Sequence, residues 1–538
     1  MKRSYLLTVA VILLALVALV PIGAQTNPSQ QPAITPAAEE EPGKWTVDDV
    51  IMEETASQFE ISPDGRWVIG VKTVANKEKS ARVSNLILSS LTEKKEIELT
   101  RGTERHSQPK WSPNGQLIAF ISTRPIPKEA SSSGEEISPP AEDKPRSHLW
   151  LMNPFGGEPW HLTDFERSVS TFAWADDQTM IFAAQEDPTF YERKLKEEKD
   201  ASIVVEDEPH EPPVRSFTLS IKSKQVTRLT DNDDWIQGLT VSPDGNYAVA
   251  LHNKSLHYTY DQRIKPVVFL YNLKTGERKP LFTESKINPA EMHWSRDGKG
   301  LYVSSAYSSH PVYLMATITV MYYYDLASGT TTPVNLGWEN GLALGYQITS
   351  GGLVASLANG ARPKLAHYTR QADGKTWTRT WIEGEHASHV FGLAVSKDDK
   401  TLVYNYSTAS TPTQWYRARF DGTTLSEPMQ LTDLNPQLKK RIIAKTEVVR
   451  WNGAKDEEVE GILYYPHQYE PGKKYALIVM IHGGPAGADY DSWDESWAYA
   501  QNLMNQRGAF VLKPNYHGSS DYGLAFVESI SGLAVRLS

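Results

Sequence analysis

The chain contains no cysteine among its 538 residues. A disulfide framework is therefore excluded, and the folded state must be stabilised by packing. Positive charge is also scarce, because 55 Lys and Arg residues oppose 65 Asp and Glu residues, for a net charge of -10. A protein that binds nucleic acid would present a basic face, so this balance indicates no nucleic-acid partner.

Long apolar runs are missing except at the N-terminus, where residues 6–20 carry only Thr8 as a polar side chain. Lys2 and Arg3 precede this run, and small residues follow it, with a cleavage site after Ala24. The pattern predicts a signal peptide at 1–24 and an exported protein, periplasmic or secreted, without stable membrane insertion after cleavage. A retained anchor is the alternative, since the run is close to the lower limit for spanning a bilayer.

Residues 25–43 are rich in Pro, Gln, Ala and Glu and predict a disordered linker. Beyond them, one short motif recurs: an apolar residue, a Ser-Pro-Asp-Gly-like turn and an apolar strand. Its copies begin at Ile61, Trp111, Trp174, Val241, Trp294 and Val395. Pro presets the first turn position, Asp or Asn caps the turn, and Gly accepts positive φ. Each copy therefore predicts a β-hairpin.

The spacing of these copies sets the number of repeats. Neighbouring copies lie 50 to 67 residues apart, except for one interval that is about twice as long. This interval leaves room for one more, degenerate copy of the motif, which we place at Thr349-Ser350-Gly351-Gly352. Seven four-stranded units predict a seven-bladed β-propeller over 44–440, although an open solenoid or a count of six or eight remains an alternative. Two insertions, 125–146 and 186–213, lengthen their units, and 192–208 is expected to be a solvated loop.

After residue 440 the pattern changes from repeats to an alternation of strands and a helix. Residues 447–451 and 459–465 predict antiparallel strands, and 476–481 is a continuous apolar run typical of a parallel strand buried on both faces. A helix is expected at 492–507, with Trp493, Trp497, Ala500 and Leu503 on one face, followed by a strand at 509–512. This order predicts the beginning of an α/β-hydrolase domain, at 441–538.

The loop after the apolar strand reads His482-Gly483-Gly484-Pro485. A glycine-rich loop at this position can offer a backbone N–H to an oxyanion hole, because glycine lets a substrate carbonyl approach closely. Gly484 is the candidate donor, and Gly483 shapes the approach. An ordinary turn is the alternative interpretation.

These motifs together resemble the prolyl oligopeptidase family of serine peptidases. The resemblance rests on the repeats, Gly461, Pro471-Gly472-Lys473-Lys474-Tyr475, the His482 loop and Asn515-Tyr516-His517-Gly518-Ser519-Ser520-Asp521-Tyr522-Gly523. It is closest to the acylaminoacyl-peptidase and bacterial dipeptidyl-aminopeptidase branch, where Arg and Gly usually stand at the positions of His517 and Asp521. The resemblance implies an all-β seven-bladed propeller followed by the N-terminal part of an α/β-hydrolase domain, and a Ser-His-Asp triad that hydrolyses short peptides behind the propeller.

No G-x-S-x-G pentapeptide, the usual setting of the nucleophile in this fold, occurs in the chain. The nucleophile, acid and base are therefore expected beyond Ser538, the chain is expected to be a truncated form that is inactive as given, and residues 445–538 are expected to be unstable alone. His482, His517, Ser519, Ser520 and Asp521 do not predict a substitute triad, because their spacing brings no base to a nucleophile.

The alternative function is a non-catalytic propeller that binds peptides or envelope partners. No metal or cofactor is expected, since His386 and His389 lack a third ligand and are interpreted as a surface loop. Glu53 and Glu54 are likewise interpreted as surface residues. The sequence predicts neither exopeptidase nor oligopeptidase action, nor the oligomeric state.

Overall fold

The computed structural model describes residues 43–127, 146–165, 167–187, 189–198, 200, 208–258, 263–284, 286–311, 314–484 and 486–530. The predicted signal peptide, residues 25–42 of the linker, Pro485 and the last eight residues lie outside these ranges. The described chain from Gly43 onward forms one compact unit, so the predicted boundary after residue 440 stays a prediction.

Each Ser-Pro-Asp-Gly motif forms the turn that its residues predict. In the first copy, Ser62 Oγ donates to Asp64 Oδ1 at 2.6 Å, the Trp67 N–H donates to Ser62 Oγ at 3.0 Å, and Gly65 has a φ of 71°. The same serine-to-acceptor hydrogen bond recurs at residues 112, 242, 295 and 396. The side chains satisfy the turn's own polar groups, which fixes the hairpin at these five repeats.

The strands β1 to β28 pair with their chain neighbours in successive antiparallel groups of four, and single bridges between β11 and β13 and between β19 and β21 join four of these groups into two eight-stranded sheets. The first three groups are β1 (Thr55–Ile61), β2 (Trp67–Asn76), β3 (Ala81–Ser90), β4 (Glu96–Glu98); β5 (His106–Trp111), β6 (Ile118–Ser122), β7 (His148–Met152), β8 (Trp160–His161); β9 (Val169–Trp174), β10 (Thr179–Gln185), β11 (Val214–Ser220), β12 (Val226–Arg228). The next two are β13 (Trp235–Val241), β14 (Tyr247–Asn253), β15 (Val267–Asn272), β16 (Arg278–Leu281); β17 (Pro289–Trp294), β18 (Gly300–Tyr307), β19 (Ile318–Asp325), β20 (Thr330–Pro333).

The last two groups are β21 (Leu342–Thr349), β22 (Gly352–Leu357), β23 (Lys364–Arg370), β24 (Trp377–Trp381); β25 (Val390–Val395), β26 (Thr401–Thr408), β27 (Thr411–Phe420), β28 (Leu425–Gln430). The degenerate copy is a genuine hairpin, because Thr349 pairs with Gly352 between β21 and β22. In the insertion after β10, helix α2 (Phe190–Glu198) and a short 3-10 helix (Glu208–His210) replace part of the expected loop. The rings of Phe190 and His210 stack at 4.9 Å and join these two helices.

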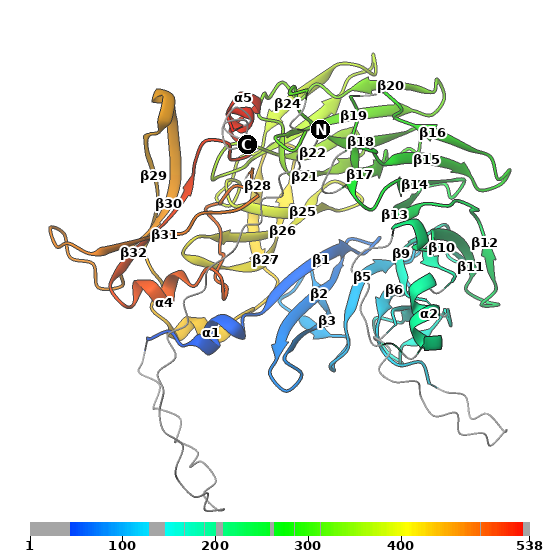
Figure 1. The fold of residues 1–538 in the computed structure, drawn as a ribbon, viewed down its shortest axis with the longest axis horizontal. Coiled ribbons are helices and arrows are strands. Elements are labelled where there is room, and N and C mark those ends of the chain that lie inside the picture. The colour runs from blue at the N-terminus through cyan, green and yellow to red at the C-terminus, as the bar shows by residue number, and fades with distance from the viewer. Residues whose placement is uncertain are drawn as a thin grey trace, which may run out of the picture. The chain divides into compact units, whose positions relative to one another are not determined.

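The first and last of these groups pack against each other, with β1 beside β27 (Figure 1). Trp415 on β27 is fully buried and donates its indole N–H to the Ala56 carbonyl of β1 at 3.4 Å. Gly70 makes room for this ring, since a Cβ there would lie 2.1 Å from the indole. The first strands of several groups, together with the turns that follow them, surround a cavity of about 490 Å³. Its lining includes Phe59, Trp111, Pro243, Arg296, Gln347 and Leu393.

The C-terminal strands form a separate sheet in the order β29 (Thr446–Asn452), β30 (Glu458–Tyr464), β32 (Ala509–Asn515) and β31 (Ala476–Val479). β29 and β30 are antiparallel and β31 runs parallel to β32, as the sequence predicts. The expectation that 476–481 is covered on both faces is wrong. Ile478 and Met480 pack toward the buried Val511, but Leu477 and Val479 are 55% and 47% exposed.

The helix expected at 492–507 is also wrong for most of its length, because only α4 (Gln501–Asn505) forms. Asp494 instead binds Lys513 at 2.6 Å, and Glu495 accepts the Asn502 N–H at 3.2 Å at the start of α4. These side-chain contacts hold 489–500 in an irregular conformation. Trp493 is buried as expected, whereas Trp497 is 87% exposed.

Contacts with the repeat strands support this C-terminal segment at several points. The Ala361 N–H donates to Glu460 Oε1 at 2.7 Å, and the Asp491 N–H donates to the Ala361 carbonyl at 2.8 Å. At the N-terminal side, α1 (Val47–Ile51) follows Trp45, whose ring stacks on Trp493. α5 (Leu524–Glu528) ends the described chain. No described helix has both the length and the apolar surface required to cross a membrane.

Candidate active site

The candidate oxyanion loop follows β31 and folds back on the turn after β32. Gly484 has a φ of 120°, and a Cβ there would lie 3.0 Å from the Gly487 nitrogen, so this position requires glycine. Gly483 has open space around its Cα and is exposed. Among the described residues, no hydrogen bond occupies the N–H of Gly483 or Gly484. The loop therefore presents two backbone donors at the surface.

His482 is buried and anchors this loop to the turn at 516–520. Its ring stacks on Tyr516 at 4.6 Å, and the Tyr516 hydroxyl donates to the His482 carbonyl at 2.8 Å. His482 Nε2 lies 2.9 Å from Ser519 Oγ. The Ser520 N–H adds a hydrogen bond to the Gly487 carbonyl at 3.1 Å. Together these contacts fix the backbone that carries the two glycines.

The structure thus pairs His482 with Ser519, which the sequence spacing did not predict. The pair lacks the third member of a triad, because His482 Nδ1 faces the Gly483 carbonyl at 3.2 Å instead of a carboxylate. Ser519 is also fully buried, so a substrate carbonyl has no access to its hydroxyl. The pair is a structural contact.

Asp521 lies apart from this pair and accepts a short hydrogen bond from the Tyr490 hydroxyl. Burial raises the pKa of Asp521 to about 6, against the lowering effect of that hydrogen bond. Its φ of 72° is a left-handed conformation that Gly adopts freely and Asp tolerates. The glycine that usually stands at this position in the resembled branch therefore has a backbone reason.

A series of hydrogen bonds connects the turn after β32 to the rest of the C-terminal segment and to the repeat strands. Asn515 donates to the Asp489 carbonyl and to the Tyr522 hydroxyl, each at 2.8 Å. Tyr522 donates in turn to Glu460 Oε1 at 2.9 Å, the same oxygen that accepts the Ala361 N–H. The turn that supports the candidate oxyanion loop is therefore fixed to the repeat strands through Glu460.

Lys513 is a buried cation behind the loop, with 2% of its side chain exposed. Its Nζ contacts Asp494 at 2.6 Å and Asp489 at 2.9 Å. Burial opposes its charge, but the two carboxylates and Tyr464 raise the pKa of Lys513. The pairing keeps the irregular segment after the loop attached to β32.

The structure corrects the surface interpretation of several residues. His386 is buried against Tyr406, and His389 Nε2 lies 3.0 Å from Asp491 Oδ2. Glu53 accepts the Trp493 indole N–H at 2.8 Å, and burial raises the pKa of Glu53 to about 7. Glu54 pairs with Lys72 at 3.0 Å. Within the described ranges, no group of three potential ligands could hold a metal ion.

Sequence reasoning missed Tyr516, Glu460 and Asp491 as supports of the candidate site. Their partners lie far along the chain, as in the 99 residues between Ala361 and Glu460. No local pattern marks such contacts.

No family model matches the chain. Among proteins similar in sequence, the uncharacterized peptidase YuxL of Bacillus subtilis is 24% identical over 90% of this chain and 73% of its own length. Dipeptidyl-peptidase 5 of Porphyromonas gingivalis is 22% identical over 61% of this chain and 44% of its own length. The chain therefore spans less than half of this second relative.

Among solved structures, Pyrococcus horikoshii acylaminoacyl peptidase matches with a TM-score of 0.63 and 18% identity, over 89% of this chain and 67% of that one. A structure from a study of two prolyl endopeptidases matches with a TM-score of 0.59 and 14% identity, over 90% of this chain and 64% of that one. At such identities the likeness concerns the fold. The homologues of this chain are therefore peptidases, and its structural neighbours are members of the prolyl oligopeptidase family.

Proposed function

We propose that this chain belongs to a serine-type peptidase that hydrolyses short peptides. The observation that carries the proposal is the loop from His482 to Gly487, where no described residue accepts a hydrogen bond from the N–H of Gly483 or Gly484 and His482 fixes the backbone beside them. Such donors stabilise the negative charge that develops on a substrate carbonyl during acyl transfer. The peptidase homologues support the same reaction class.

We infer that the four-stranded groups are the seven blades of a propeller, and that the propeller limits access to the peptidase site. The inference is supported by the packing of β1 against β27 and by the cavity on which the innermost strands converge. A propeller in this place would admit short peptides and exclude folded proteins. In the active chimera described below, a folded protein with a cleavable surface loop should therefore resist hydrolysis under conditions in which the isolated loop peptide is cleaved.

The catalytic serine, acid and base are proposed to lie outside these 538 residues, because no G-x-S-x-G motif occurs and Ser519 is buried. The chain alone should then be inactive. Incubation with a fluorophosphonate probe, followed by mass spectrometry, should label no serine. Labelling that is lost in Ser519→Ala and in His482→Gln would instead identify the buried pair as a working nucleophile and base.

The oxyanion role can be tested in a chimera in which residues 1–530 continue into the C-terminal peptidase segment of the Bacillus subtilis relative. We expect hydrolysis of fluorogenic peptide amides, and a loss of roughly 100-fold in kcat when Gly484→Val displaces the donor. Gly156→Val is the matched control, because its side chain would also meet open space and it lies on an exposed turn outside the candidate site. Equal activity of the Gly484 variant and the parent would contradict the assignment of this donor.

Export is the remaining part of the proposal and rests on the sequence pattern of residues 1–24. Expression in a Gram-negative host should place the protein in the periplasmic fraction, with a mature N-terminus at Gln25. A cytoplasmic product that keeps Met1 would contradict export.

A further inference from the structure

The loop that follows β18 binds a carboxylate from a distant part of the chain. The Ser308 hydroxyl and the Ser309 N–H donate to Glu528 Oε1 at 2.9 and 2.6 Å. The His310 N–H donates to the same oxygen at 3.1 Å, and the Ser309 hydroxyl donates to Glu528 Oε2 at 2.7 Å. Burial would raise the pKa of Glu528, but the hydrogen bonds from the two serines outweigh it and lower the pKa. The loop is therefore a site for an ionised carboxylate.

The corresponding loop of the preceding group, after β14, binds a carboxylate in the same way. Ser255 and Ser308 occupy the same position, 13 residues after the serine of their own turn motif. The Ser255 hydroxyl donates to Glu208 Oε2 at 3.2 Å, and the N–H groups of Leu256 and His257 donate to it at 2.6 and 3.3 Å. Glutamates from two unrelated parts of the chain fill equivalent loops, so the preference for a carboxylate belongs to the loop.

Two further loops, after β22 and β26, donate the N–H groups of Ala361 and Ala409 to carboxylates of the C-terminal segment. Their acceptors, Glu460 and Asp491, are 6% and 5% exposed, so burial shields these two contacts from an outside ligand. Glu528 is only half-buried and lies on α5, close to the end of the described chain. Of the three loops that hold the C-terminal segment, the loop after β18 is therefore the one that an outside carboxylate can reach.

A cavity of about 290 Å³ lies beside this loop and favours an anion. Ser308 and Ser309 line it together with Lys265 and Lys286. Among the described residues that line it, none is acidic, and Glu284, two residues before Lys286, is exposed and outside the lining. A carboxylate that enters here meets hydroxyl and N–H donors together with two cations, and hydrogen bonds of this charge-assisted kind are the strong ones.

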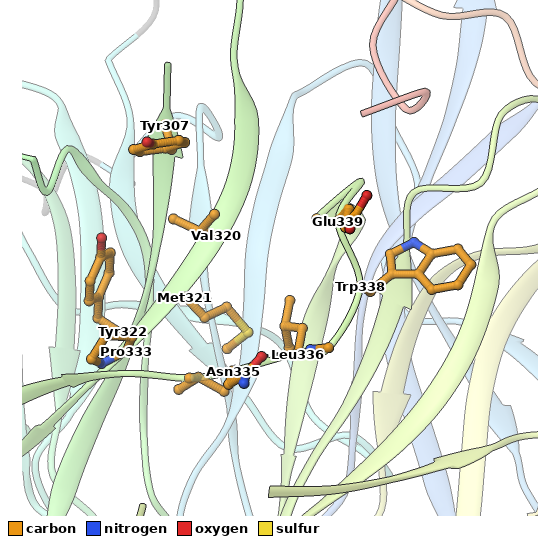
Figure 2. Close-up of a pocket in the computed structure, with 12 residues that line it drawn as sticks. Tyr307, Val320, Met321, Tyr322, Pro333, Asn335, Leu336, Trp338 and Glu339 are labelled. Atoms are coloured by element: carbon orange, nitrogen blue, oxygen red, sulfur yellow. Dashed lines mark hydrogen bonds between the residues drawn. The ribbon is translucent and has the colours of Figure 1, made fainter. Parts of the chain in front are cut away.

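A second cavity gives room for the rest of a ligand that is anchored at this loop. Tyr307, the last residue of β18, borders both cavities, and the second has a volume of about 560 Å³ (Figure 2). Val320, Met321 and Leu336 make its lining largely apolar, as is typical of sites that take small ligands. A carboxylate site next to an apolar cavity fits the terminal residues of a short peptide.

We infer that the loop at Ser308–His310 is a receptor for the carboxylate of a short peptide, which takes the place of Glu528. The inference rests on the proposed function in that it takes the ligand to be a peptide. Backbone N–H groups of such loops are a recurring means of capturing a chain terminus. The exchange replaces one carboxylate by another, so the site keeps its charge and its hydrogen bonds.

Calorimetric titration of the full chain tests the exchange without any catalysis. In Glu528→Ala, acetyl-alanyl-alanyl-phenylalanine should bind at least about tenfold more tightly than its carboxamide, because hydrogen bonds to a charged group are strong. The parent should bind the free acid about tenfold or more weakly than this variant, since Glu528 competes as a tethered ligand. Acetyl-glutamyl-alanyl-phenylalaninamide separates the two sources of a carboxylate: affinity like that of the free acid assigns the site to acidic side chains as well, and affinity like that of the carboxamide assigns it to the chain terminus.

Further variants locate the effect at the loop. Adding Ser308→Ala and Ser309→Ala to Glu528→Ala removes two hydroxyl donors and should reduce the preference for the free acid several-fold, about the value of such hydrogen bonds. Glu470→Ala removes an exposed carboxylate of the same C-terminal segment and should bind like the parent. Glu528→Gln keeps the size of the side chain, covers the case in which Glu528→Ala fails to fold, and should also bind the free acid more tightly than the parent.

Equal affinity of the free acid and the carboxamide in both Glu528 variants would overturn the inference, as would equal binding of the free acid by these variants and the parent. A chimera that fails to hydrolyse peptides while the preference for the free acid persists would reject the peptidase function alone.

Discussion

At the scale of single residues, the candidate site depends on two glycines that look equivalent in the sequence and differ in the structure. Gly484 is at positive φ with backbone nitrogens close to its missing Cβ, whereas Gly483 faces open space. Gly484→Ala should therefore lower the free energy of unfolding by about 1–2 kcal/mol, and Gly483→Ala should change it little. Urea denaturation of the two variants measures this difference, and equal midpoints would contradict it.

Asp521 gives a pH-dependent prediction at the same scale. Its pKa is about 6 in the folded protein against an ordinary 3.8, so the folded state holds the proton to higher pH than the unfolded state. The free energy of unfolding therefore falls as the pH rises from about 4 to 6, and above pH 6 the whole destabilisation by the buried carboxylate is present. Asp521→Asn keeps an acceptor for Tyr490 and a residue that tolerates positive φ.

The Asp521→Asn variant should exceed the parent in stability by roughly 2–3 kcal/mol at pH 8, since one pKa unit is worth about 1.4 kcal/mol. The difference should shrink toward zero near pH 4. Denaturation series from pH 4 to 8 provide the measurement. Parallel curves for the two proteins would show that the carboxyl group titrates normally.

At the scale of elements, β31 is an edge strand with an open apolar face. Leu477 and Val479 are exposed on it, and its outer backbone groups have no neighbouring strand in the described sheet. Such an edge promotes association between chains. The instability of residues 445–538 alone stays a prediction, which limited proteolysis can test.

Val479→Lys should reduce aggregation at constant stability, because a charge on an exposed edge opposes strand pairing. Static light scattering on heating measures the effect. Val511→Lys is the control on the neighbouring strand: Val511 is fully buried, so this variant should unfold the sheet and aggregate more. A Val479 variant that aggregates like the parent would exclude this edge as the contact.

At the scale of the whole molecule, Asp491 links the C-terminal segment to three separate parts of the repeat region. Its carboxylate contacts Arg362 at 2.7 Å and His389 at 3.0 Å, and accepts the Ala409 N–H at 3.1 Å. Burial alone would raise the pKa of Asp491, but these hydrogen bonds outweigh it and lower the pKa to about 2. The stabilisation is therefore present above pH 4 and is lost as the pH falls toward 2.

Asp491→Ala should lower the free energy of unfolding by about 2–3 kcal/mol at pH 7, because it leaves the Ala409 N–H unsatisfied and removes the partner of His389. Asp373→Asn serves as a comparison, since Asp373 contacts only its own exposed turn. The loss of stability should be clearly smaller than that of Asp491→Ala, because substitutions of exposed surface residues change stability little. Similar losses of unfolding free energy in the two variants would show that the contacts of Asp491 with the repeat region add no stability beyond that of an exposed turn.

The sequence determined the features that depend on local chemistry. Turn residues such as Ser62 and Asp64 satisfy each other within one hairpin, so the repeats and most strand positions were predictable. The parallel strand before His482 follows from an apolar run of adjacent residues, whereas the difference between Gly483 and Gly484 appears only in the structure. The helix expected at 492–507 was not formed, because Lys513 and Asn502 bind Asp494 and Glu495 in competition with it.

Only the tertiary structure decided which distant groups meet. His482 contacts Ser519, Glu460 contacts Ala361, and Asp491 contacts His389. Each pair is far apart in the chain, and no local sequence pattern predicts these contacts. Burial also raised the pKa values of Glu53 and Asp521, two carboxyl groups that no sequence pattern marks as unusual. The sequence by itself predicted most of the strands and led to the proposed reaction class, while packing decided which side chains support the candidate site, because contacts and desolvation arise only when separate elements come together.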